Sequence, residues 1–230
     1  MVIPGRWLLP LLLLLLAAFA VPAAAQDLAG LYDAQGKYPG GKDYTGAVKI
    51  VPLGQAHAIL WKLDSGEGYE GLAIRQNNVF GAAYTMGKIP FGLVVYRIAG
   101  NVLDGEWVTS GDPKAELGRE TLEGTQQSLG GTYKITLGQN RDGTTNYTGE
   151  VIIKPDGPTF LVAWMVPKLA YVGRGVRIGD VLVVAYGRST DPKKLPGVVA
   201  YQIEDADAMV GVWATAGASA TGTESLKRRP

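Results

Sequence analysis

The chain has 230 residues, with 22 basic and 21 acidic side chains, one histidine and no cysteine. This balance gives no excess of charge with which to bind nucleic acid or an anionic membrane surface. The lack of cysteine excludes disulfides, cysteine-ligated metal centres and thiol nucleophiles.

Residues 1–25 have the three parts of a secretory signal peptide. A short segment carrying Arg6 precedes an apolar run over residues 7–20, and small residues follow as far as Ala25. The apolar run is shorter than the roughly 20 residues that cross a bilayer, although an uncleaved anchor is the alternative. We therefore expect cleavage after Ala25, a mature chain that is periplasmic or secreted, and no integral membrane span after cleavage.

The rest of the chain reads as two copies of one unit, a first β-repeat over residues 26–125 and a second over 126–230. The series Tyr-Thr-Gly at 44–46 recurs at 147–149, and GLVVYRI at 92–98 aligns with GVVAYQI at 197–203. The matches keep the same order along both copies, which indicates an internal duplication.

Each copy is predicted to consist of short strands. Over residues 44–52 apolar and polar side chains alternate, as in a strand with one buried face. Six further runs follow in the first copy, near residues 57–63, 69–76, 79–85, 91–99, 102–110 and 118–124. Asn77-Asn78 and Gly179-Asp180 separate neighbouring runs as hairpin turns do. No run is long enough for a crossover helix, and a helix over 112–117 is disfavoured because the second copy replaces it with small residues.

Eight short antiparallel strands per copy most simply close into a barrel, because closure removes exposed strand edges. The sequence thus predicts an all-β protein of two tandem antiparallel up-and-down eight-stranded barrels, joined by the polar link at 123–130. The alternative is one larger β-sandwich or barrel with one repeat in each half. An outer-membrane barrel is disfavoured, because its strands need roughly 9 to 11 residues.

Candidate binding residues are those that recur in both copies on one strand face. Trp107, Thr109 and Glu120 in the first copy correspond to Trp213, Thr215 and Glu224 in the second, and Trp61 corresponds to Trp164. His57 corresponds to Phe160 and is therefore interpreted as structural. No catalytic, cofactor or metal-binding motif is recognisable, so no cofactor and no metal are expected.

The carboxylate of Glu120 falls on the apolar face of its strand, where a lone charge is costly. One interpretation is an internal ion pair of Glu120 with Arg75 that closes the barrel. The other is that Trp, Thr and Glu side chains line a cavity for a small molecule.

The unit resembles avidin-like barrels of the calycin type, which carry inward tryptophans, in the segments Gly130-Gly131-Thr132-Tyr133 and Trp107-Val108-Thr109-Ser110-Gly111. The whole series of recurring motifs also resembles exported proteobacterial tandem β-repeat proteins, usually uncharacterised and sometimes labelled fibronectin-binding. That label would imply adhesion to an extracellular protein such as a matrix component.

The sequence favours an exported, non-enzymatic binding protein. Its partner would be a small apolar or aromatic molecule in a barrel cavity, or an extracellular or envelope protein on its surface, and not a nucleic acid. The alternative is a structural envelope-associated protein with filled barrels and no ligand. A hydrolase using Glu120 or Glu224 would require a second carboxylate nearby.

Overall fold

The computed structural model describes residues 27–230 except 127, 145–146, 190 and 192–193, so the expected signal peptide lies outside the described residues. Sixteen strands form in the described part of the chain, eight from each copy. The first copy supplies β1 (Gly30–Lys37), β2 (Asp43–Leu53), β3 (Ala56–Leu63), β4 (Gly68–Gln76), β5 (Val79–Thr85), β6 (Gly92–Ala99), β7 (Val102–Thr109) and β8 (Gly118–Gly124). The second supplies β9 (Gly131–Gln139), β10 (Glu150–Asp156), β11 (Thr159–Val166), β12 (Leu169–Ile178), β13 (Val181–Gly187), β14 (Gly197–Ile203), β15 (Ala208–Ala214) and β16 (Gly222–Arg228). Among these residues no helix is long and apolar enough to cross a membrane.

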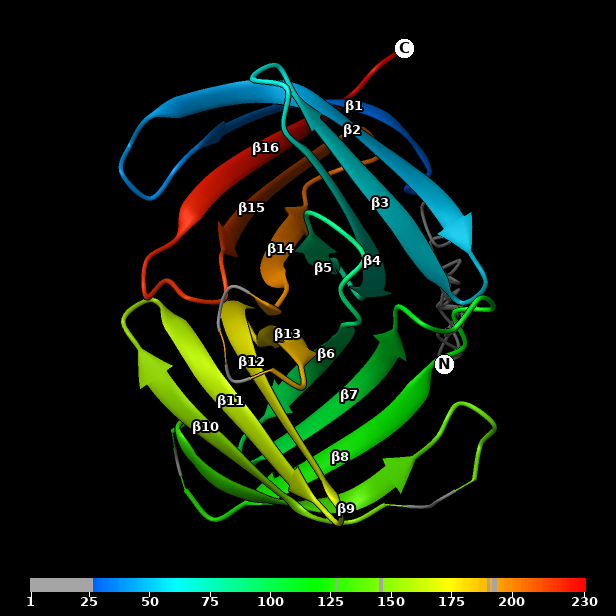
Figure 1. Ribbon diagram of the computed structural model, residues 1–230, viewed down its shortest axis with the longest axis vertical. Helices are drawn as coiled ribbons and strands as arrows, with labels where there is room; N and C mark the ends of the chain where they lie inside the picture. Colours follow the sequence, from blue (N-terminus) through cyan, green and yellow to red (C-terminus); the bar gives the residue numbers. More distant parts are fainter. Residues whose placement is uncertain (1–26, 127, 145–146, 190, 192–193) are drawn as a thin grey trace, which may run out of the picture.

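The strands close into two antiparallel eight-stranded barrels, which confirms the predicted fold class. Barrel 1 has the strand order β1-β16-β15-β14-β5-β4-β3-β2, and barrel 2 has the order β10-β11-β12-β13-β6-β7-β8-β9. Figure 1 shows barrel 1 above barrel 2, with β5, β6, β13 and β14 in the middle of the molecule.

The composition of the barrels differs from the expectation of one barrel per copy, because the two copies exchange their last three strands. Barrel 1 combines β1–β5 with β14–β16, and barrel 2 combines β6–β8 with β9–β13. Two of the antiparallel ladders that join strands of different copies pair β5 with β14 and β13 with β6. The link at 123–130 was expected to join separate barrels, but it connects the paired strands β8 and β9 within barrel 2.

The tight turns follow from local chemistry. Asn77 adopts a positive φ of 55° between β4 and β5, and Gly179 one of 57° between β12 and β13. Asparagine and glycine tolerate this left-handed region better than other residues, so both pairs form the predicted hairpin turns. Residues 112–117 form a loop before β8, as the comparison of the copies predicted.

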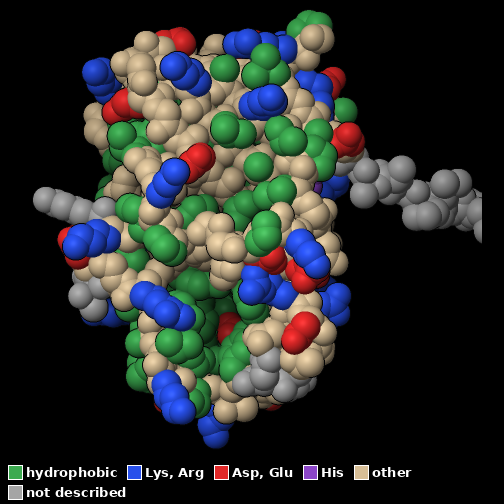
Figure 2. All heavy atoms as spheres, turned by 45° about the vertical axis from the view of Figure 1, so that its right-hand side comes forward, with side chains coloured by type: hydrophobic (Ala, Val, Ile, Leu, Met, Phe, Trp, Pro, Cys, Tyr) green, Lys and Arg blue, Asp and Glu red, His purple; other side chains and the backbone are tan. Residues whose placement is uncertain are grey.

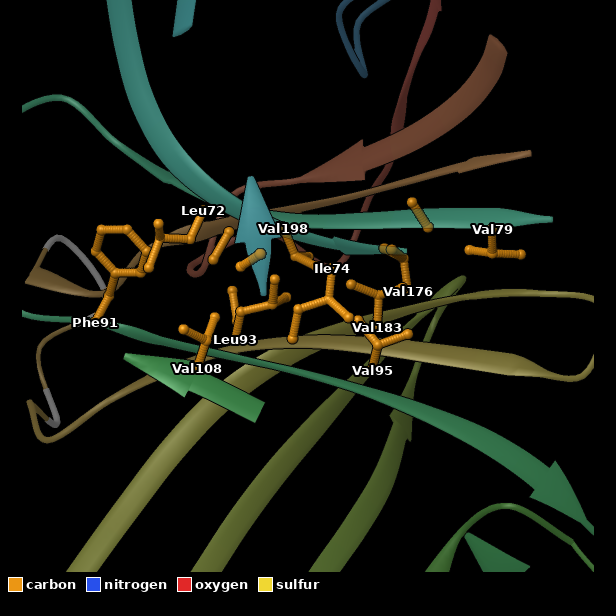
Figure 3. Packing of buried hydrophobic residues seen from close by; sticks show 14 of the residues in the cluster. Leu72, Ile74, Val79, Phe91, Leu93, Val95, Val108, Val176, Val183 and Val198 are labelled. Atoms are coloured by element: carbon orange, nitrogen blue, oxygen red, sulfur yellow. The ribbon is translucent and has the colours of Figure 1, made fainter. Parts of the chain in front are cut away.

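The two barrels pack against each other through the outer faces of their central strands. Side chains of β4, β5 and β14 meet those of β6, β12 and β13 in one buried cluster (Figure 3). A Cβ on Gly81 of β5 would lie only 2.7 Å from a methyl group of Val183, so glycine there permits the close approach of the barrels. One face of β5 packs against barrel 2 and the other faces the interior of barrel 1, so its residues are buried on both faces.

A buried arginine adds a polar link across this interface. Arg174 of β12 is 4 % exposed and pairs with Asp156 of the same barrel at 2.5 Å. Its Nε donates to the carbonyl of Ala216, which follows β15 of barrel 1. A guanidinium buried in this way needs its donors satisfied, and Arg174 meets this need with partners from both barrels.

The strand exchange predicts the behaviour of an isolated copy. Residues 27–125 alone contain five strands of one barrel and three of the other, so neither barrel is complete within one molecule as it is composed in the full chain. Because β6 resembles β14 in sequence, two such molecules can exchange strands and rebuild both barrels. We expect a dimer by light scattering coupled to size exclusion. A folded monomer would contradict this expectation, because β5 would then have paired with β6 of the same copy.

Candidate functional site

A cavity of about 680 Å³ occupies the interior of barrel 2 and opens to solvent. Figure 2 shows the hollow in the lower half of the molecule, with hydrophobic side chains on its walls and an acidic side chain inside it. The aromatic and apolar part of the lining includes Trp107, Tyr147, Trp164, Leu169, Tyr171 and Tyr186. The polar part includes Thr109, Glu120, Asn140 and Arg141.

The carboxylate of Glu120 is held inside the barrel by aromatic donors. Glu120 lies on β8, where its side chain faces the same way as Leu122, and it is 3 % exposed. Its Oε1 accepts a hydrogen bond from the Tyr96 hydroxyl and one of 3.0 Å from Trp164 Nε1. Burial raises the pKa of this carboxyl, and the hydrogen bonds from Tyr96, Trp164 and Tyr147 partly offset that rise.

Barrel 1 contains the same arrangement around Glu224. The Glu224 carboxylate accepts hydrogen bonds from the hydroxyl of Tyr201, from Trp61 Nε1 at 3.1 Å and from the Tyr44 hydroxyl at 3.0 Å. Burial likewise raises its pKa. The two carboxylates are therefore equivalent members of the duplicated fold.

The aromatic rings near each carboxylate also match between the barrels. In barrel 2, Tyr186 contacts Trp164 and Tyr171 with ring centroids 5.2 and 5.5 Å apart. In barrel 1, Tyr84 contacts Trp61 and Tyr69 at 5.8 and 5.5 Å. The interiors thus share one aromatic framework.

Each barrel contains candidate binding residues from both copies of the repeat. Trp107, Thr109 and Glu120 come from the first copy and meet Trp164 of the second copy in barrel 2. Trp213 and Glu224 of the second copy lie in barrel 1 with Trp61 of the first. Thr215 follows β15 and is exposed. Each site is therefore assembled from both copies.

The indole N–H of Trp107 has unused hydrogen-bonding capacity at the cavity. Its Nε1 is buried and completes no hydrogen bond, and the same holds for Trp213 Nε1 in barrel 1. Burial is the main cause of the raised pKa of the neighbouring Tyr147 hydroxyl. A ligand with an acceptor atom could use this donor.

The proposed internal ion pair of Glu120 with Arg75 was wrong. Arg75 lies on β4 of barrel 1, where its Nε donates to the carbonyl of Asn77, whereas Glu120 lies in barrel 2. Tyrosine and tryptophan donors take the place that a cation was expected to fill. His57 lies edge-on to Phe80 in barrel 1 at 5.4 Å, and burial lowers its pKa, as expected of a structural histidine.

The tyrosines that bind the carboxylates were missed at the sequence level. Tyr44 aligns with Tyr147, and Tyr96 with Tyr201, so their recurrence was a usable signal. Asn140 and Arg141 gave no such signal, because the first copy has Tyr38 and Pro39 at these places.

Comparisons with known proteins do not assign the site. A scan against protein-family models finds no match, and a search of curated proteins finds none either. Within the described residues no group of three or more His, Asp or Glu side chains is arranged to hold a metal ion.

The raised pKa of Glu120 predicts a loss of stability with rising pH. The folded protein binds the proton more tightly than the unfolded chain, so its free energy of unfolding falls as pH rises from about 4.5 through the folded pKa. Glu120→Gln removes this titration and should become more stable relative to wild type over that range, by about 1.4 kcal/mol per unit of pKa shift. Urea unfolding at several pH values measures the difference, and a constant difference would contradict the assignment.

The hydrogen bond from Tyr96 predicts a second pH effect. Tyr96→Phe removes a donor that lowers the pKa of Glu120, so the substitution should cost about 1–3 kcal/mol and cost more at neutral pH than below pH 4.5. Tyr133→Phe is the matched control, because the Tyr133 hydroxyl donates to the backbone carbonyl of Leu129. Equal pH dependence of the two variants would show that Tyr96 does not act through Glu120.

Proposed function

We propose that the protein is an exported, non-enzymatic binding protein whose barrel 2 takes up a small, largely apolar aromatic molecule. The observation that carries this proposal is the open cavity of about 680 Å³. Small-molecule sites have volumes of about 300–1,000 Å³ and are mostly apolar, with a few placed polar groups. The lining of barrel 2 has this character, since aromatic rings surround Glu120 and the indole N–H of Trp107.

The cavity favours a binding role over a purely structural role with filled barrels. A barrel that serves only as a scaffold gains stability by filling its interior, because empty apolar space forfeits packing contacts. In barrel 2 the rings of Tyr171 and Tyr186 instead border open space. The proposed periplasmic or extracellular location would expose this space to molecules outside the cytoplasm.

The arrangement around Glu120 favours binding over hydrolysis. Among the described residues that line the cavity, Glu120 supplies the carboxylate, and no second one stands near it for acid and base roles. Its Oε1 is already engaged by Tyr96 and Trp164. We therefore propose that Glu120 orders the aromatic walls.

Fluorescence with the neutral probe N-phenylnaphthylamine tests the proposed function on the chain lacking residues 1–25. We expect saturable binding that Thr109→Trp weakens by about tenfold or more, because the indole would enter the cavity that Thr109 lines. The counterpart Thr215→Trp is exposed at the end of barrel 1 and should leave binding unchanged. Absence of binding by the wild type, or equal effects of both variants, would refute the cavity as the site.

A further inference from the structure

An aromatic side chain of the protein itself packs against the rings at one end of barrel 1. The ring of Tyr38 packs against those of Tyr44 and Trp213, with centroids 4.8 and 6.0 Å apart. Its hydroxyl donates to Glu67 Oε2 at 3.2 Å. Tyr44 and Trp213 correspond to Tyr147 and Trp107, which line the cavity of barrel 2.

Barrel 2 has Asn140 at the place of Tyr38. Each is the first residue after its strand, β1 or β9. Each donates its backbone N–H to the carbonyl four residues later, Tyr38 to Lys42 and Asn140 to Thr144, both at 2.9 Å. The two loops therefore start alike, and the short amide of Asn140 leaves open the space that the phenol ring of Tyr38 covers.

The charges at the two mouths differ as well. Arg141 lines the cavity of barrel 2, whereas barrel 1 has Pro39 at this place. Arg188, the first residue after β13, donates to the Tyr171 hydroxyl at 3.0 Å and lies 5.3 Å from the ring centroid. The first residue after β5 is Met86. Two arginines thus lie at the mouth of barrel 2, where the corresponding residues of barrel 1 are uncharged.

Arg141 lines the cavity and is anchored there by an ion pair. One of its nitrogens pairs with Asp112 Oδ2 at 3.1 Å, and Asp112 is itself fixed by backbone N–H groups of Lys114 and Glu116. A guanidinium carries five donors in a planar fork, so an anchored arginine can still bind a carboxylate or sulfonate.

Building on the proposed function, we propose that Tyr38 occupies in barrel 1 the place that an aromatic ring of the ligand takes in barrel 2. The ligand of barrel 2 is then an aromatic acid, whose ring lies against Tyr147 and Trp107 and whose anionic group meets Arg141 at the mouth. Glu67, which binds the hydroxyl of Tyr38, corresponds to Leu169, so barrel 2 has no carboxylate at that place to repel the anion. One chain binds one such molecule, because barrel 1 is covered by Tyr38.

Two probes with the same aromatic framework test the proposal, anilinonaphthalene sulfonate and the uncharged N-phenylnaphthylamine. We expect one site per chain for both, with the sulfonate bound about fivefold more tightly, and Arg141→Gln should abolish that preference while retaining the neutral probe. Equal affinity for the two probes in the wild type, or a preference that survives Arg141→Gln, would overturn the assignment of an acidic ligand.

Exchanging the residues that differ at the two mouths tests the placement of the ring. Asn140→Tyr should weaken the neutral probe by tenfold or more, whereas Asn140→Ala should retain it. Tyr38→Asn should open barrel 1 and add a second site for the neutral probe, which tests the proposal even if Asn140→Tyr does not fold. If neither Asn140→Tyr nor Tyr38→Asn changes probe binding, this inference alone is overturned. If the wild type binds neither probe, the proposed function is refuted as well.

Discussion

The pairing of β5 with β14, and of β13 with β6, is the constraint on which the whole molecule depends. Without these two ladders each copy is an open sheet of five strands and another of three, with apolar faces uncovered. With them, both barrels close, and the chain changes barrel between β5 and β6 and again between β13 and β14. The two barrels share no strand, and the buried cluster between their central strands couples the stability of one to that of the other.

Each barrel buries a carboxylate, which accepts hydrogen bonds from side chains of both copies. Glu120 and Trp164 come from different copies, as do Glu224 and Trp61. Tyr96 and Tyr201 instead donate to the carboxylate of their own copy. A buried carboxylate is tolerated where its oxygens accept several hydrogen bonds. Since both barrels satisfy this need identically, the carboxylates belong to the shared framework, and differences in function must come from the parts that differ.

The sequence predicted the strands and the closed antiparallel barrels well, because alternation and turn residues are local signals. It also placed Glu120 on the inner face with Leu122, as observed. The exchange could not be read in the same way, because β6 and β14 are so alike that either satisfies the side chains of β5. A usable sign was the almost uninterrupted apolar character of β5 and β13, which indicates strands covered on both faces. The sequence analysis offered a cavity in either barrel and did not distinguish the two, because Asn140, which lines the cavity of barrel 2, has no recurring counterpart.

The physical difference between the two mouths suggests why one barrel would keep an opening. In barrel 1 the ring of Tyr38 packs against Trp213 and Tyr44. Because this contact is made within the chain, it contributes to folding stability independently of any ligand concentration. In barrel 2 the corresponding rings of Trp107 and Tyr147 face the cavity, so the same contact is left to a molecule from solution. A bound ligand then stabilises the folded state in proportion to RT ln(1 + [L]/Kd). Because the two barrels share a large buried cluster, ligand bound in barrel 2 should stabilise barrel 1 too, and the chain as a whole should unfold in one transition that shifts with ligand concentration.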